Sequence, residues 1–121
     1  MEIVFVAIGG GIGATLRYII SQIPTKIEFP ILTLLTNILG AMLIGFIAGI
    51  ASQKDNVSPN TILFWKTGVC GGFTTFSTFS LEAFELFEKN LYLSGGIYMA
   101  SSVACCILGV VLGKKLVLLA V

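Results

Sequence analysis

The segment GGFTTFSTFS, residues 71–80, decides how this chain folds, because it interrupts a long apolar stretch with residues that a helix disfavours. Adjacent glycines and a run of Thr and Ser have low helix propensity. We therefore expect a spanning helix over about residues 61–87 that breaks near mid-membrane. Unwound backbone at that depth is tolerated only where it is buried in protein or lines a cavity. Its freed carbonyl oxygens suit a hard cation, and its freed N–H groups suit an anion.

The rest of the chain has the composition of a membrane protein. Of its 121 residues, 56% are hydrophobic and 11% are charged, whereas a soluble domain carries about 25% charged residues. The charges cluster between apolar runs long enough to cross a bilayer, which takes about 20 residues in a helix. We expect an all-α membrane protein, with residues 1–121 forming a single transmembrane domain. Its four spans are predicted at about residues 3–23, 30–51, 61–87 and 91–119.

Each predicted span carries two glycines four residues apart, a spacing that places both on one helix face and lets backbones approach closely. The pairs are Gly9 and Gly13, Gly45 and Gly49, Gly68 and Gly72, and Gly109 and Gly113. One pair would mean little by itself, but a pair in every span predicts tight helix packing, either within a subunit or between subunits.

Short loops predict an antiparallel series of spans with both termini on one side of the membrane. The distribution of Lys and Arg in loops sets orientation, and here the two sides carry four and three such residues. We expect the chain to insert in both orientations and to pair as an antiparallel dimer, the smallest unit with room for a water-lined path. A single orientation that this count fails to detect is the alternative.

Neutral polar residues line up on single helix faces. Asn37 follows Thr33 by one turn, and the fourth span carries a line of such residues at intervals of four: Ser94, Tyr98, Ser102 and Cys106. Phe76 and Phe79 share a face, and an aromatic ring has a positive edge that attracts an anion. Glu82, nearest the membrane of three acids, could close this polar path. Interhelical hydrogen bonding and ordinary aromatic packing are the alternatives for any one of these residues.

The sequence lacks the parts of an enzyme active site. It contains no histidine, no pair of carboxylates inside the spans and no set of Cys and His ligands. Its three cysteines lie in apolar stretches and are interpreted as packing residues. With a net charge of +1 and no basic patch, the chain is not expected to bind nucleic acid.

Over essentially its whole length the sequence resembles the Fluc (CrcB) family of fluoride channels. The resemblance rests on GGIGATLRY (residues 10–18), TNILG (36–40) and GVCGGFTTFSTFS (68–80), the last being highly specific. It implies a multi-pass channel of the cell membrane that lets cytoplasmic fluoride leave by passive electrodiffusion and so protects the cell from fluoride toxicity. It also implies an antiparallel dual-topology dimer with two pores. Whether the chain pairs with itself or with a paralogue is left open.

The resemblance also implies roles for individual residues. The fluoride pore would be lined by Asn37, Phe76, Ser77, Thr78, Phe79, Glu82, Tyr98 and Ser102. The edges of the two phenylalanine rings would face the ion. The backbone carbonyls of Gly71 and Thr74 would hold a structural sodium ion at the dimer interface, and Arg17 matches the family's first-helix arginine. Cys106 departs from the family, since a hydroxyl is expected there and a thiol is a weaker donor.

Physical reasoning agrees with a fluoride channel. Fluoride is small and strongly hydrated, so a pore must replace its water with many donors, while a fixed positive charge would hold the ion too tightly. A small dual-topology drug or cation exporter is one alternative, but it needs a carboxylate inside the first span, and no acid lies between Glu2 and Glu28. A non-conducting packing subunit is another alternative, but it would need neither a broken helix nor polar tracks.

Overall fold

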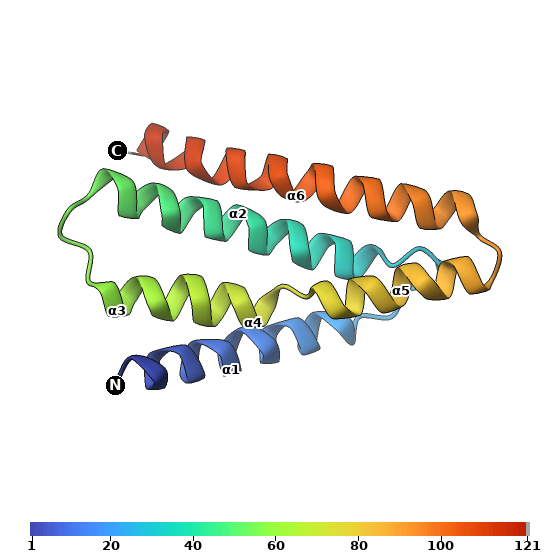
Figure 1. Ribbon diagram of the computed structural model, residues 1–121, viewed down its shortest axis with the longest axis horizontal. Coiled ribbons are helices and arrows are strands. Elements are labelled where there is room, and N and C mark those ends of the chain that lie inside the picture. The colour runs from blue at the N-terminus through green and yellow to red at the C-terminus, as the bar shows by residue number, and fades with distance from the viewer. Residues whose placement is uncertain (121) are drawn as a thin grey trace.

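The computed structural model describes residues 1–120, and all regular structure in this range is helical. The elements are α1 (Glu2–Ser21), α2 (Ile31–Gln53), α3 (Pro59–Ile62), η1 (Leu63–Cys70), α4 (Gly71–Phe73), α5 (Phe76–Glu88) and α6 (Tyr92–Ala120). Figure 1 shows a bundle in which the chain runs back and forth, so that the start of α1 and the end of α6 lie at the same end. The predicted all-helical fold with a broken third helix is confirmed.

Helices α1, α2 and α6 are each long and apolar enough to cross a membrane. The third predicted span is divided, because α3, η1 and α4 run end to end up to Phe73 and α5 begins at Phe76. Its two halves nevertheless follow one line through the bundle between α1 and α2 (Figure 1). Which residues of these helices lie within the bilayer stays a prediction.

The glycine pairs bring backbones into direct contact. A Cβ atom added at Gly9 would lie 3.0 Å from the Cα of Gly68, which joins α1 to η1. A Cβ atom at Gly45 would lie 2.9 Å from the Cα of Val110, and one at Gly113 would lie 2.8 Å from the nitrogen of Phe46. These distances leave no room for a side chain between α2 and α6. The pairs therefore serve packing within the subunit.

The first half of the broken helix has a feature that the sequence did not indicate. Residues Leu63–Cys70 form a π-helix rather than an α-helix. Such segments are rare and occur frequently at functional sites. Here the π-helix leads directly into the residues that precede the break.

A buried cluster fixes the second half of the broken helix. It consists of Leu34 from α2, Phe79, Ala83 and Leu86 from α5, and Tyr98 from α6. Tyr98 is fully buried at its centre. Because the cluster joins three helices, it sets the position of Phe79 relative to the polar residues of α2 and α6.

Candidate functional site

The helix break lies at Thr74 and Thr75. Both residues have extended backbones, with φ −83° and ψ 156° for Thr74 and φ −147° and ψ 121° for Thr75. The Thr75 hydroxyl caps the new helix by accepting the N–H of Thr78 at 3.1 Å, which is the usual role of Thr at a helix start. The break therefore falls within the predicted segment, but it follows the two glycines, which remain helical.

Asn37 holds the broken backbone in place. Its Nδ2 donates to the Thr75 carbonyl at 3.1 Å, and its Oδ1 accepts the Thr75 N–H at 2.8 Å. A side-chain amide nitrogen carries two N–H groups, so one remains for another acceptor. The sequence predicted an amide donor at Asn37, and the structure adds that this side chain replaces the missing helical bonds of Thr75.

The break also frees carbonyl oxygens. Since the Thr75 N–H bonds Asn37 and the Thr78 N–H bonds the Thr75 hydroxyl, the carbonyls of Gly71 and Thr74 lose the donor that a continuous helix would supply. Gly71 is exposed, and a Cβ atom there would meet nothing within 4 Å. Unpaired carbonyl oxygens are ligands that suit a hard cation.

A groove of about 400 Å³ runs beside the break. Its walls come from α2, η1, α4, α5 and α6, and its polar and aromatic lining comprises Asn37, Lys66, Thr74, Thr75, Phe76, Phe79, Ser102 and Cys106. Ser102 is 7% exposed, and its hydroxyl oxygen has no hydrogen-bond partner within residues 1–120. A buried polar group without a partner is costly, and a ligand bound beside Ser102 in the groove would supply the missing partner.

A row of aromatic rings continues from the groove. The ring centroids of Phe76 and Phe79 are 5.5 Å apart, and those of Phe79 and Tyr98 are 5.0 Å apart. Phe79 is 9% exposed, whereas Phe76 is 78% exposed. The Tyr98 hydroxyl donates to Glu82 at 2.9 Å, and the Thr33 hydroxyl donates to the other oxygen of the same carboxylate at 3.1 Å.

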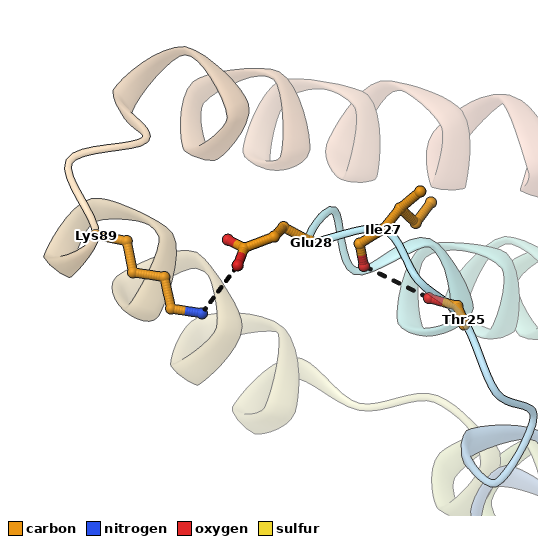
Figure 2. A network of polar contacts seen from close by, with 4 residues as sticks. All are labelled: Thr25, Ile27, Glu28 and Lys89. Atoms are coloured by element: carbon orange, nitrogen blue, oxygen red, sulfur yellow. Dashed lines mark hydrogen bonds and ion pairs between the residues drawn. The ribbon is translucent and has the colours of Figure 1, made fainter.

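Glu82 lines a second cavity of about 220 Å³, beyond Tyr98, between the linker that follows α1 and the end of α5. Figure 2 shows its rim, where Lys89 forms an ion pair with Glu28 at 3.8 Å and the Thr25 hydroxyl donates to the Ile27 carbonyl at 3.5 Å. Both charged side chains are more than half exposed, so the pair contributes little stability. It nevertheless ties the linker to α5 beside the cavity.

The other predicted residues lie away from the groove. Arg17 donates from Nε to the Gly72 carbonyl at 3.2 Å and lines a separate cavity of about 60 Å³ together with Thr78. Ser77 is exposed, with its hydroxyl oxygen 3.4 Å from that of Thr75. The structure thus brings together Asn37 of α2, Phe76 and Phe79 of α5, and Tyr98 and Ser102 of α6. Arg17 instead contacts the Gly72 carbonyl, just before the break.

Lys66 lines the groove but was not among the predicted site residues. Among residues 1–120 it is the one charged residue in the groove lining. The sequence did indicate such a role for Lys66, because a lysine within an apolar span commonly marks an ion path.

A family model described as "CrcB-like protein, Camphor Resistance (CrcB)" matches residues 4–114. A protein of Ruminiclostridium cellulolyticum named "Fluoride-specific ion channel FluC" is 46% identical over 121 residues, which cover 96% of this chain and 92% of that protein. A Rhizobium etli protein of the same name is 41% identical, with 93% of each chain covered. "Fluoride-specific ion channel FluC 2" of Staphylococcus saprophyticus is 40% identical, with 96% of this chain and 99% of that protein covered.

Proposed function

The chain belongs to the CrcB family, and from this membership we infer that it is a fluoride-specific ion channel of the cell membrane and not an enzyme. The curated relatives are named as fluoride-specific channels and match nearly its whole length. Hydrogen fluoride crosses membranes as a neutral acid and dissociates in the cytoplasm. A passive channel then lets the trapped anion leave, driven by the inside-negative potential, and so protects the cell from fluoride toxicity.

The unpaired hydroxyl of Ser102 is the structural observation that supports this function best. It is buried beside a groove whose other polar groups are neutral donors, Lys66 excepted. An anion that gives up its water needs such donors, and neutral donors release it again because they bind it only moderately. We propose that Asn37, Phe76, Phe79 and Ser102 form one stretch of the fluoride path.

The path continues, in this proposal, along Tyr98 towards Glu82. Tyr98 contacts Phe79 on the groove side and Glu82 on the side of the second cavity, which supports a continuous route. Ser77 and Thr78 are proposed to supply polar groups beside the rings. Arg17 is proposed to act by holding the backbone before the break through its bond to the Gly72 carbonyl.

We further propose that the working unit is an antiparallel dual-topology dimer, formed with a second copy or with a paralogue. Phe76 is 78% exposed beside a groove that is open along one side. A partly dehydrated anion would not be stable in a groove that faces lipid. A second chain that covers this face would close the groove and bury Phe76.

A structural sodium ion at the centre of that dimer is proposed as well. The carbonyls of Gly71 and Thr74 fit such an ion, because both lack their helical donor and carbonyl oxygens suit hard cations. Gly71 faces open space, as a residue at an interface between copies would. The ion would supply positive charge that stabilises carbonyl dipoles brought together from two chains.

Fluoride efflux from proteoliposomes, followed with a fluoride electrode, tests the proposed function. Purified protein expressed alone should release fluoride, while protein-free liposomes should not, and chloride release should remain far slower. An absence of fluoride release from folded protein would overturn the function. Dual topology is tested by labelling an Ala120→Cys variant in intact and permeabilised cells, and labelling from one side only would refute it.

A further inference from the structure

Lys66 occupies an unusual place for a charged residue. It is exposed, it lies on η1, and it lines the same groove as Ser102 and Phe79. Within residues 1–120 no carboxylate forms an ion pair with it, since the ion pair found there joins Lys89 and Glu28. A lysine inside an apolar span is costly and normally faces an ion path or a partner. Since no carboxylate of residues 1–120 satisfies the charge, an anion in the groove is a candidate for its counterion.

The position of Lys66 along the groove agrees with this interpretation. It precedes the break at Thr74 by about two helical turns, and its half of the broken helix starts at the bundle end where α1 begins (Figure 1). Glu82 lies on the opposite side of the break, beyond Phe79 and Tyr98. The groove therefore has a cation at one end, and its aromatic row leads to a carboxylate at the other.

We propose that Lys66 collects fluoride in the part of the groove lined by η1 and raises the local concentration of the anion before it reaches the neutral donors. This inference rests on the proposed fluoride channel function. A positive wall in a groove with low-dielectric sides attracts anions and speeds their arrival. Lys66 is exposed on this chain, and an ammonium group with access to water stays strongly hydrated, so it would attract fluoride without holding it as a buried charge would.

A second role for such a lysine is to extend along the apolar surface and place its ammonium group among lipid headgroups. The two roles differ in three measurable respects. If Lys66 collects anions, fluoride flux depends on the sign of the charge at position 66, on fluoride concentration and on ionic strength. If Lys66 contacts headgroups, a substitution changes insertion and stability, and its effect on flux is the same at every fluoride concentration and ionic strength. The lining of the groove favours anion collection, because Lys66 lines it together with the neutral donors Asn37 and Ser102.

A charge series at position 66 tests the proposal in phosphatidylcholine liposomes. At low fluoride and low ionic strength, Lys66→Arg should conduct as the native protein does, Lys66→Gln about threefold more slowly and Lys66→Glu about tenfold more slowly. In 1 M salt, where the Debye length is about 3 Å, the differences should disappear. Lys115→Gln and Lys115→Glu are the matched controls, because Lys115 is exposed on α6 and does not line the groove.

The possible outcomes separate this inference from the function on which it rests. If Lys66→Glu conducts as fast as the native protein, or if its flux is reduced as much in high salt as in low salt, the inference alone is overturned. An absence of flux from the native protein would overturn the proposed function and the inference with it. Size-exclusion chromatography in detergent establishes that each variant is folded. Should Lys66→Glu not fold, a steeper salt dependence for the native protein than for Lys66→Gln would support the proposal, and equal dependence would refute it.

Discussion

Asn37→Ala tests whether the helix break is held by a side chain. The substitution removes two hydrogen bonds, at 3.1 Å to the Thr75 carbonyl and at 2.8 Å from the Thr75 N–H. Each is worth about 0.5 to 1.5 kcal/mol, and a buried backbone group left without a partner costs about 1 to 3 kcal/mol. Because the site is only partly buried and water can enter the groove, we expect a loss of about 2 to 4 kcal/mol in the free energy of unfolding.

Reversible unfolding of the purified protein in mixed detergent micelles, by titration with sodium dodecyl sulfate, measures this loss. The matched control is Asn56→Ala, the same substitution in the exposed turn between α2 and α3, which should change the free energy of unfolding by less than about 0.5 kcal/mol. Fluoride efflux should fall with Asn37→Ala, since the Thr75 backbone would no longer be fixed beside the groove. A variant as stable as the control, with native efflux, would refute the reasoning.

Four further substitutions test the packing and the aromatic row. Gly13→Ala places a Cβ atom 2.7 Å from the backbone nitrogen of Phe73 and should lower the free energy of unfolding by about 1 to 3 kcal/mol. Gly11→Ala is the control and should leave the free energy of unfolding unchanged, because a Cβ atom there meets nothing within 4 Å. Tyr98→Phe removes a 2.9 Å bond to a carboxylate and should cost about 1.5 to 3 kcal/mol; an unchanged titration midpoint would contradict that value. Phe76→Ile and Phe79→Ile should abolish efflux and preserve assembly, as judged by size-exclusion chromatography, and native efflux would argue against the ring-edge role.

Local sequence features predicted the elements of this fold well. The apolar runs indicated the long helices, and the Thr and Ser run indicated the break, which the structure places at Thr74 and Thr75. The spaced glycines indicated close packing, and the contact between Gly9 and Gly68 shows it. These features are local, because a helix in lipid must satisfy its own backbone hydrogen bonds and so depends on its own residues.

The composition of the site was harder to predict than its location. The spacing of four between Tyr98 and Ser102 placed both on one face of α6, but it did not show that the Tyr98 hydroxyl bonds Glu82 while the Ser102 hydroxyl remains without a partner in residues 1–120. Helical periodicity states which residues share a face. It does not state which other helix that face meets, and hydrogen-bond partners depend on that choice.

By itself the sequence determined that this chain is a helical membrane protein with a broken third helix, since solvation by lipid constrains each segment separately. Only the tertiary structure decided that Asn37 replaces the missing helical hydrogen bonds of Thr75, that Lys66 lines the groove, and that Arg17 donates to the Gly72 carbonyl before the break. These contacts join residues far apart in the chain. Their existence depends on the packing of helices against one another, and no segment carries that information alone.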